Sequence, residues 1–434
     1  VPDAEMISLY ASHEKIYPRS VSGFFSKWRW GMVFLTQLVF YGIPWLEWGQ
    51  RQAVLFDLGA RRFYIFGLVL YPQDFIYLTG ILVISALSLF LFTAVAGRLW
   101  CGYACPQTVY TEMFLWIEKK VEGDRSARMR RDAQPLSLDK FTRKSAKHLL
   151  WLMVALWTGF TFVGYFTPIK DLAAEFVQMQ MGSWEVFWTF FYGFATYGNA
   201  GFMREQVCKH MCPYARFQSA MFDKDTLIVT YDEARGEPRG ARSRKADPAV
   251  LNLGACIDCT LCVQVCPTGI DIRKGLQYEC IGCGACADVC DTVMDKMGYA
   301  KRLVKYSTEN AINQHWTKSQ TIRHVLRPRI LIYSAILAAI VVAMLISLSL
   351  RTPFKVDVVR DRGVMARIVS GGKVENVYRL QLMNATESAQ RYKITASGLP
   401  GLSVSSENVV TVGSTESRWV AVRVQAPFDA AEPG

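Results

Sequence analysis

Two cysteine runs constrain this chain more than any other feature. Each run reads C-x2-C-x2-C-x3-C, and together they occupy residues 256–290. Three cysteines at such short intervals wrap a tight loop around one cubane, while the fourth cysteine reaches across to a neighbouring cubane. The spacing therefore predicts a bacterial-type ferredoxin domain with two [4Fe–4S] clusters.

The crossed fourth cysteine assigns ligands to each cluster. The first cluster is predicted to bind Cys256, Cys259, Cys262 and Cys290. The second cluster is predicted to bind Cys280, Cys283, Cys286 and Cys266. A pair of zinc ribbons is the alternative, but zinc ribbons usually pair two CxxC units across a longer spacer. Asp291 stands where Pro267 closes the first run, so the two clusters need not share a potential.

Composition places these cysteines in a membrane protein. Of the 434 residues, 51% are hydrophobic, and the mean hydropathy is above zero. All 12 cysteines belong to closely spaced groups, which suits metal or redox chemistry facing a reducing cytoplasm better than a disulfide framework. The net charge of +12 lies in loops between apolar spans, so membrane orientation explains it more simply than nucleic-acid binding.

Five apolar segments are long enough to cross a hydrocarbon core of roughly 30 Å. They are residues 30–46, 75–97, 149–169, 186–203 and 330–350. Another apolar run, residues 63–73, is shorter and contains Pro72, so we expect it to be interfacial or re-entrant. No small-residue cleavage site follows the first span, and we expect that span to stay in the protein.

The distribution of Lys and Arg predicts the orientation. Residues 98–148 carry 11 basic residues, whereas residues 168–185 carry only Lys170. Basic loops are retained in the cytoplasm. We therefore expect the N-terminus, the second loop and the ferredoxin domain to be cytoplasmic. An odd number of spans then places the C-terminal segment on the far side of the membrane.

The C-terminal segment predicts a small β-sandwich. Alternating apolar residues occur in residues 377–384, 391–397 and 417–425, with Gly and Pro between the runs. The segment has no cysteine, so its likeness to an immunoglobulin fold is architectural only. The predicted fold class is an α-helical membrane protein with about five transmembrane helices, an inserted 2[4Fe–4S] ferredoxin domain and a C-terminal immunoglobulin-like β-sandwich.

Domain boundaries follow from these segments. Residues 1–29 are predicted to form a cytoplasmic N-terminal segment, residues 30–223 a membrane domain with four spans, and residues 224–327 the cytoplasmic ferredoxin domain. Residues 328–350 form the fifth predicted span, and residues 351–434 the periplasmic β-domain.

A second cysteine system lies at the membrane boundary. Two C-x3-C-P motifs directly follow the second and fourth spans, and they contain Cys101, Cys105, Cys208 and Cys212. Both spans run toward the cytoplasm, so the motifs reach one membrane depth and could bring four thiols together. The proline after each motif suits the first turn of a helix, which places Cys105 and Cys212 at helix starts. A thiol at a helix start has a lowered pKa and is a better reductant and soft-metal ligand.

The chemistry of these four boundary thiols has several alternatives. Small apolar residues packing a helix end are the plainer interpretation, which repetition of the whole motif disfavours. Copper, a third cluster, a quinone nearby or a disulfide all remain open. His210 and Met211 could add ligands, but His210 suits an interfacial hydrogen-bonding role equally well. Only His148 also lies near the boundary, so a bis-His haem is disfavoured, and no CxxCH motif for c-type haem occurs.

Longer stretches of sequence carry a family resemblance. They are residues 44–58, 61–75, 96–114 and 208–223, together with the two ferredoxin runs and the trailing β-domain. In these stretches the chain resembles the FixG/CcoG/RdxA family of bacterial inner-membrane iron–sulfur proteins, which is linked to assembly of the cbb3-type cytochrome c oxidase. The resemblance implies reduction of Cu(II) to Cu(I) for that oxidase. It also implies that residues 351–434 are the family's immunoglobulin-like accessory domain.

Three functions are compatible with these features. The first is a cupric reductase in which electrons pass through two clusters to copper at the boundary thiols. The second is an electron-transfer subunit without its own substrate, since the C-x3-C-P pair is also similar to that of the NapH and NosR membrane ferredoxins, which implies transfer from quinol toward periplasmic reductases. The third is an assembly factor whose clusters only stabilise the fold.

Expected partners follow from the first two functions. They are membrane lipid, proteins of copper delivery and cbb3-type oxidase assembly, and an electron donor that the sequence does not identify. Nucleic acid is not an expected partner, and the sequence leaves a homo-oligomer open.

Overall fold

The computed structural model describes residues 15–247, 250–363 and 366–430. Residues 1–14 of the predicted N-terminal segment and residues 431–434 of the predicted β-domain lie outside the described residues. The chain divides into two compact units. The first unit contains Val1–Ile43, Ile81–Gly164 and Asp171–Ile340, and the second contains Pro44–Gly80, Tyr165–Lys170 and Val341–Gly434.

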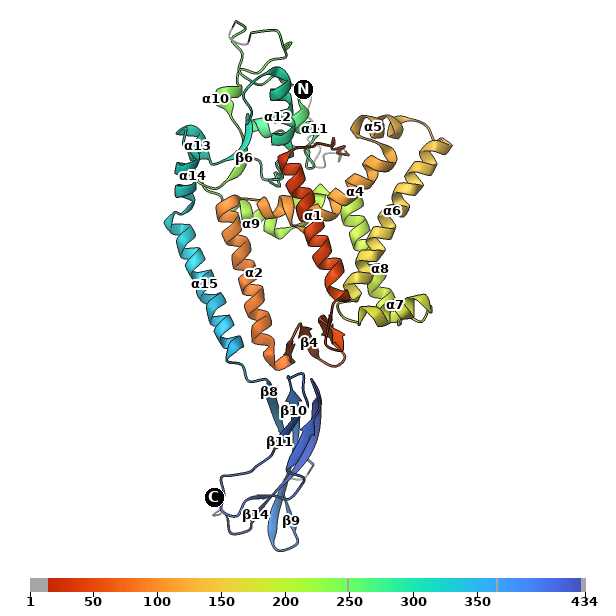
Figure 1. The fold of residues 1–434 in the computed structure, drawn as a ribbon, viewed down its shortest axis with the longest axis vertical. Coiled ribbons are helices and arrows are strands. Elements are labelled where there is room, and N and C mark those ends of the chain that lie inside the picture. The colour runs from red at the N-terminus through yellow and green to blue at the C-terminus, as the bar shows by residue number, and fades with distance from the viewer. Residues whose placement is uncertain (1–14, 248–249, 364–365, 431–434) are drawn as a thin grey trace, which may run out of the picture. The chain divides into compact units, whose positions relative to one another are not determined.

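Helices dominate the first unit (Figure 1). The longer ones before the ferredoxin segment are α1 (Phe24–Gly42), α2 (Phe75–Ala96), α4 (Pro106–Glu122), α6 (Leu138–Val163) and α8 (Ser183–Gly198). The shorter ones are α3 (Leu99–Tyr103), α5 (Arg125–Ala133), α7 (Ile169–Val177) and α9 (Pro213–Met221), with π-helical turns η3 (Asn199–Met203) and η4 (Val207–Met211). Asp124 and Ser137 begin α5 and α6, because their side chains accept backbone N–H groups of the first turn.

Close packing of α4, α6 and α8 forms the core of the helical part. Phe114 of α4 stacks on Trp151 of α6 with ring centroids 5.0 Å apart, and both side chains are buried. Gly159 lets α6 approach α8 closely, since a Cβ atom there would lie 2.1 Å from the Thr189 carbonyl oxygen.

Three helices in the described part of the chain are long and apolar enough to cross a membrane. They are Pro72–Ala96, Leu138–Val163 and Pro328–Ser349, which correspond to the second, third and fifth predicted spans. The first predicted span is helical within α1, but α1 also contains Lys27 and Arg29. The fourth begins in α8, which has 16 residues before the π-helical turn. The five-span count therefore stays a prediction.

The ferredoxin segment folds around a two-stranded antiparallel ribbon. Its strands, β6 (Ile228–Tyr231) and β7 (Val304–Ser307), lie near the two ends of the segment and close it. Between them lie α10 (Glu233–Gly236), α11 (Leu261–Gln264), η5 (Ile272–Lys274) and α12 (Ala285–Met297). The buried core includes Val229, Ile272, Met294 and Leu303. After β7, α13 (Glu309–Asn313) and α14 (Lys318–Val325) lead to α15 (Pro328–Ser349).

The part of the second unit after residue 351 contains two packed sheets. The larger sheet has the order β12-β14-β10-β8, with β9 paired to β10. Its strands are β8 (Phe354–Arg360), β9 (Arg367–Val369), β10 (Lys373–Asn384), β12 (Ser403–Val404) and β14 (Ser417–Pro427). The smaller sheet pairs β11 (Gln390–Lys393) with β13 (Val409–Val412). Leu382, Val410 and Val412 are buried in one core, so all three predicted strand regions form strands, the middle one shorter than predicted.

Residues 63–73 form β-structure in place of the expected interfacial or re-entrant segment. β3 (Val54–Asp57), β4 (Arg62–Ile65) and β5 (Leu68–Leu70) make a three-stranded antiparallel sheet, and β1 (Glu47–Trp48) pairs with β2 (Arg51–Gln52). Tyr64 and Val69 of this run are buried with Leu55, Met383 and Ala385, whereas Phe66 is 42% exposed. This packing explains part of the apolar composition of residues 63–73, which suggested a place at the membrane interface.

Candidate functional site

The first ferredoxin run and the last cysteine of the second run line one cavity. Its thiols are Cys256, Cys259, Cys262 and Cys290, the set expected for the first cluster. Apolar side chains such as Val293 and Leu303 complete the wall. Cys290 reaches this cavity because α12 carries it back toward the first loop, as the crossed spacing requires.

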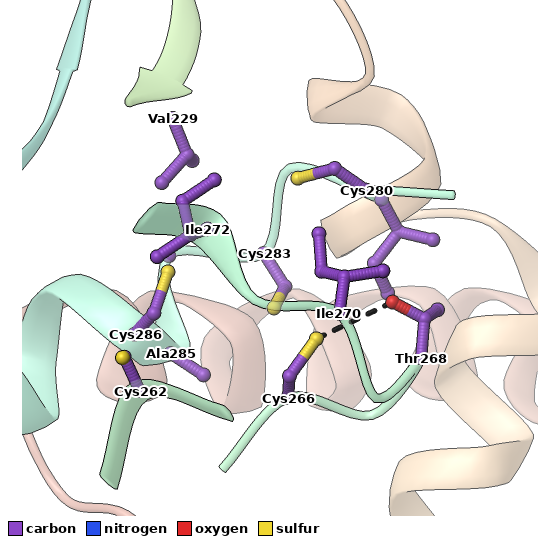
Figure 2. Close-up of a pocket in the computed structure, with 12 residues that line it drawn as sticks. Val229, Cys262, Cys266, Thr268, Ile270, Ile272, Cys280, Cys283, Ala285 and Cys286 are labelled. Atoms are coloured by element: carbon purple, nitrogen blue, oxygen red, sulfur yellow. Dashed lines mark hydrogen bonds between the residues drawn. The ribbon is translucent and has the colours of Figure 1, made fainter. Parts of the chain in front are cut away.

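A second cavity holds the other four ferredoxin thiols, with Cys262 also on its wall. Cys266, Cys280, Cys283 and Cys286 line it (Figure 2). Ile270 and Ile272 form apolar parts of the wall, and the Thr268 hydroxyl lies 3.3 Å from Cys266 Sγ. The four thiols gathered in each cavity fit the ligand set of one cubane.

Matching backbone geometry shapes the two cysteine loops. Asp258 and Thr260 have φ of 50° and 56°, and Gly282 and Gly284 at the corresponding places have φ of 65° and 72°. These left-handed residues turn each loop between successive cysteines. Thr260 and Gly284 then start α11 and α12, so the third cysteine of each run lies in the first turn of a helix.

Several ferredoxin thiols lie in a desolvated environment, whereas Cys259 is exposed. Burial raises the pKa of Cys262 to about 11 and that of Cys280 and Cys290 to about 12. Such thiols are bound as thiolates only when metal charge compensates them. In the described residues, no three His, Cys, Asp or Glu side chains converge tightly enough to hold a single metal ion. A cubane needs no such convergence, because each of its irons takes one thiolate.

The four boundary thiols lie at the predicted places in the chain. Cys105 and Cys212 directly precede the prolines that begin α4 and α9. Cys101 lies in α3 and Cys208 in η4. Burial, and then the nearby Cys105, Cys101 and Cys212 thiols, raise the pKa of Cys208 to about 12. The four thiols are thus near enough to interact electrostatically, although no three of them converge on a single-ion site among the described residues.

The expected lowering of the thiol pKa at a helix start is wrong for Cys105. Burial raises the pKa of this thiol, while the backbone N–H groups of Gln107 and Thr108 act in the opposite direction. Desolvation outweighs the helix start because the thiol lies mostly inside the protein. Burial likewise raises the pKa of Cys101 to about 11.

Gln218 is a member of this site that sequence reasoning missed. Its side chain in α9 is fully buried, and its Nε2 atom lies 3.4 Å from Cys101 Sγ. It lies one helical turn after buried Ala215, so a polar residue on the buried face of α9 was the available signal.

The neighbouring histidines behave differently from the thiols. His210 is exposed, and Met211 is 55% exposed. His148 of α6 lies with Nδ1 2.9 Å from the Tyr197 hydroxyl and stacks on Phe202. His148 therefore has a packing role in the helical core.

The boundary thiols contact the ferredoxin domain directly. Cys101 and Cys208 pack against a buried cluster that contains Ile281, Cys283 and Ala285. Asp288 of α12 also accepts hydrogen bonds from the backbone N–H groups of Phe25 and Ser26, at 3.1 and 2.7 Å, and so caps the start of α1. The ferredoxin domain and the membrane helices are thus joined beside the second cavity.

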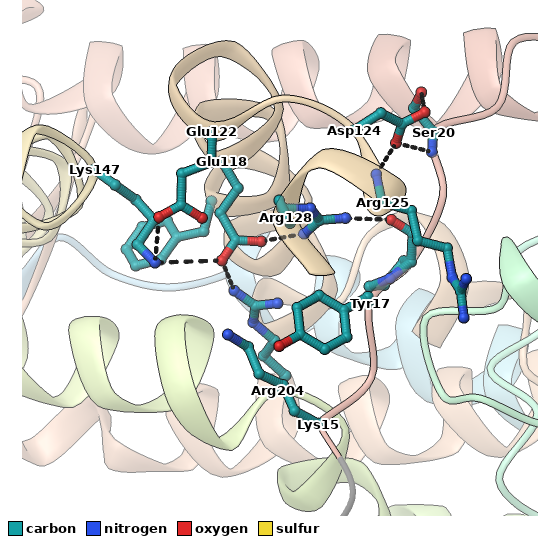
Figure 3. Close-up of polar contacts among 12 residues, drawn as sticks. Lys15, Tyr17, Ser20, Glu118, Glu122, Asp124, Arg125, Arg128, Lys147 and Arg204 are labelled. Carbon is teal, nitrogen blue, oxygen red and sulfur yellow. Dashed lines mark hydrogen bonds and ion pairs between the residues drawn. The ribbon is translucent and has the colours of Figure 1, made fainter. Parts of the chain in front are cut away.

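A buried ion cluster joins α4, α5 and α6 (Figure 3). Glu118 of α4 accepts Arg128 of α5 at 2.5 Å and Arg204 at 2.7 Å. Lys147 of α6 lies 3.3 Å from Glu122. Burial alone would raise the pKa of Glu118, but the neighbouring Arg204, Arg128 and Lys147 hold it below its usual range.

Three family models match parts of the chain. The family of 4Fe-4S dicluster domains matches residues 203–309, which contain the eight ferredoxin cysteines together with Cys208 and Cys212. A family described as a 4Fe-4S binding domain matches residues 78–122, which contain Cys101 and Cys105. The family described as an IG-like fold at the C-terminal of FixG matches residues 344–434. These matches support two [4Fe–4S] clusters, a redox function and the immunoglobulin-like fold.

Three curated proteins are similar to nearly the whole chain. "Nitrogen fixation protein FixG" of Rhizobium meliloti is 38% identical, over 96% of this chain and 85% of its own length. "Protein RdxB" of Cereibacter sphaeroides is 40% identical, over 98% of this chain and 91% of its own. "Protein RdxA" of the same organism is 38% identical, over 96% of this chain and 91% of its own. The chain therefore belongs to the FixG/RdxA family of iron–sulfur electron-transfer proteins.

Proposed function

We propose that this protein reduces Cu(II) to Cu(I) at the four boundary thiols and supplies Cu(I) for assembly of a cbb3-type cytochrome c oxidase. The observation that carries the proposal is that four half-buried thiols lie near one another and that two of them, Cys101 and Cys208, pack directly against the buried cluster beside the second cysteine cavity. The two [4Fe–4S] clusters supply single electrons when bound. We assign Cys256, Cys259, Cys262 and Cys290 to one cluster, and Cys280, Cys283, Cys286 and Cys266 to the other.

The chemistry of the boundary site favours the reduced ion. Thiolates are soft ligands that select Cu(I) over harder divalent ions, so they favour reduction of bound copper. Each Cu(II) takes one electron, and the thiols release protons as they bind the metal. Gln218 orients Cys101, while apolar Ile281 limits water on one side. Two thiolates suffice to hold one Cu(I), so the site does not need three ligands at single-ion distance.

We also propose a topology for this reaction. The N-terminus, the boundary thiols and the ferredoxin domain lie on the cytoplasmic side of the inner membrane, and the β-domain lies in the periplasm. This orientation rests on the basic residues of the loops before α6 and around the ferredoxin segment. The β-domain then faces oxidase assembly and copper-delivery partners, while the electron donor is cytoplasmic or a quinol.

One observation favours the second function, electron transfer without a substrate. The 4Fe-4S binding family that matches residues 78–122 covers only two cysteines, Cys101 and Cys105. A third cluster shared by the two boundary motifs would account for this match. Electrons would then leave the boundary site for a partner protein.

Metal analysis of two forms of the protein separates these functions. Anaerobically purified wild type and the variant with Ser at Cys101, Cys105, Cys208 and Cys212 are compared for iron, acid-labile sulfide and copper. For a cupric reductase we expect about eight iron per chain in both forms, since each cubane holds four. We also expect loss of Cu(I) formation in the variant, followed with a chromogenic Cu(I) chelator after dithionite prereduction.

Exposed His210 provides the matched control, because His210→Ala should retain copper reduction. About twelve iron in wild type and about eight in the four-Ser variant would favour the third cluster. Wild-type copper reduction by the four-Ser variant would contradict the proposal outright.

A further inference from the structure

The helix that carries Cys101 touches the loop of the second cavity through its main chain. An ideal Cβ atom on Gly102 would lie 2.8 Å from the Gly282 carbonyl oxygen, 2.9 Å from the Ile281 carbonyl oxygen and 3.0 Å from Cys283 Cα. Real Cβ atoms essentially never approach other atoms below 3.0 Å. Only glycine fits between α3 and this loop without displacing backbone.

The loop makes the same close approach from its own side. Gly282 has φ of +65°, and a Cβ atom on it would lie 3.2 Å from the carbonyl carbon and 3.3 Å from the carbonyl oxygen of Arg98. Gly102 therefore lies against the carbonyl groups of Ile281 and Gly282, and Gly282 lies against the carbonyl group of Arg98. No side chain of Gly102 or Gly282 separates α3 from the loop, so the main chains of the two redox sites are in direct contact.

Hydrogen bonds fix this contact. The Tyr103 hydroxyl donates to the Cys283 carbonyl oxygen at 3.3 Å, and the Tyr306 hydroxyl donates to the Gly282 carbonyl oxygen. The two hydroxyl groups lie 3.3 Å from each other. Both residues next to Gly102 thus serve the junction, since Cys101 belongs to the thiol site and Tyr103 ties α3 to the loop.

We propose that electrons pass from the cluster held by Cys266, Cys280, Cys283 and Cys286 to the boundary thiols across the Gly102 contact. This inference rests on the proposed function, and it makes Gly102 and Tyr103 positioning residues. Electron transfer through protein slows steeply as the gap between donor and acceptor widens, and Gly102 and Gly282 let the two main chains approach each other closely. Each Cu(II) gains one electron and the cluster loses one. A low-potential one-electron donor then returns one electron to the cluster. No bond to the protein forms or breaks in the transfer itself.

Gly102→Ala in the full-length protein tests the route. The clusters are reduced with dithionite, excess reductant is removed, and their reoxidation by Cu(II) is followed in single-turnover mixing. We expect this step to slow several-fold, because the added methyl group pushes α3 away from the loop and widens the gap that the electron crosses. Reoxidation by ferricyanide, which reaches the ferredoxin domain from solvent, should keep its wild-type rate.

A second readout is independent of copper. Hydrogen–deuterium exchange at the amides of residues 281–283 should quicken in the Gly102→Ala variant, because the new methyl group separates the two main chains. The matched control is Gly31→Ala in α1, where a Cβ atom meets nothing within 4 Å. Gly31→Ala should retain wild-type values in every measurement.

The outcomes separate this inference from the proposed function. Wild-type copper kinetics in a Gly102→Ala variant with full iron would overturn the route and leave the cupric reductase intact. Clusters of wild type that are reoxidised by ferricyanide but not by Cu(II) would overturn the proposed function. If Gly102→Ala loses iron, Tyr103→Phe decides, because it removes one hydrogen bond without adding volume. Slower copper reoxidation with full iron then supports the route, and an unchanged rate overturns it.

Discussion

The buried side-chain amide of Gln218 contacts the thiol of Cys101. An amide N–H donates to a thiolate and an amide oxygen accepts from a thiol, so this side chain matches both protonation states of Cys101. No charged group is needed at this position, which leaves the site free to gain the charge of a metal. The Cys101 thiol is therefore oriented before any metal arrives.

Replacing Gln218 by Leu should weaken Cu(I) retention and leave the ferredoxin clusters in place. Losing a hydrogen bond to a buried charged group costs about 1.5–3 kcal/mol, which corresponds to about 10- to 100-fold in affinity. Competition with a Cu(I) chelator measures the change, and iron analysis monitors the clusters. Gln134→Leu, at an exposed position, is the control. Equal Cu(I) affinity in the two variants would show that Gln218 only packs the helix.

Among the elements, α4 connects the boundary site to the rest of the helical part. Its first turn follows Cys105, and its last two turns carry the buried carboxylates Glu118 and Glu122. Arg128 of α5 joins Glu118 and also donates to the Pro18 carbonyl oxygen. The ion cluster therefore ties the last two turns of α4 to α5 and α6.

Glu118→Gln should destabilise the protein, because it leaves buried cations without their partner. Breaking a buried ion pair in this way costs about 3–5 kcal/mol. The pKa of Glu118 is depressed in the folded state, so its contribution is present above its unfolded pKa and is lost as pH falls through the folded value. The gap in thermal unfolding temperature between wild type and variant should therefore shrink below a pH of about 4.3.

The exposed Asp139–Arg143 pair provides the control for this prediction. Asp139→Asn should change stability by less than about 1 kcal/mol. Equal shifts for Glu118→Gln and Asp139→Asn at neutral pH would contradict the role assigned to the ion cluster.

The sheet β3-β4-β5 extends the core of the β-domain. Leu55 and Val69 are buried with Met383, and the Tyr71 hydroxyl donates to the Asn384 carbonyl oxygen at 2.9 Å. Arg351 lies 2.6 Å from the buried carboxylate of Asp74. The β-domain that starts at residue 351 is thus completed by residues far earlier in the chain.

Leu55→Ala should loosen this shared core without affecting the clusters. Truncating a buried leucine costs about 2–5 kcal/mol. Hydrogen exchange at residues 382–385 should quicken, while iron content stays at the wild-type level. Leu58→Ala is the matched control, since Leu58 is 62% exposed. Unchanged exchange in Leu55→Ala would mean that the β-domain is complete without β3-β4-β5.

Across the whole molecule, the sequence predicted the features that depend on short motifs. The ferredoxin domain, the helix starts after Cys105 and Cys212 and the strands near residues 377 and 417 were all readable from short motifs. Gln218 was not, because its partner lies 117 residues away in the chain. The pKa of Cys105 was mispredicted for the same reason, since burial depends on tertiary packing.

Contacts between distant segments also bear on the number of membrane crossings. Ser20 bonds to Asp124 at 3.0 Å, so the chain between them should cross the membrane an even number of times. Glu118 bonds to Arg204, which requires the same of the chain between α4 and η4. Counting only the three strongly apolar helices gives one crossing in each interval. Crossing by α1 as well as α2, and by α8 as well as α6, meets both conditions.

We therefore predict five crossings, with residues 44–74 and 164–182 in the periplasm. Reporter insertions at exposed Ala60 and Gln180 should match a reporter fused after Val424, and insertions at Arg130 and Lys245 should give the opposite signal. Three crossings would instead put Ala60 and Arg130 on opposite sides but Ala60 and Lys245 on the same side. A cytoplasmic signal at Ala60 would exclude the five-span arrangement, because α1 would then not cross.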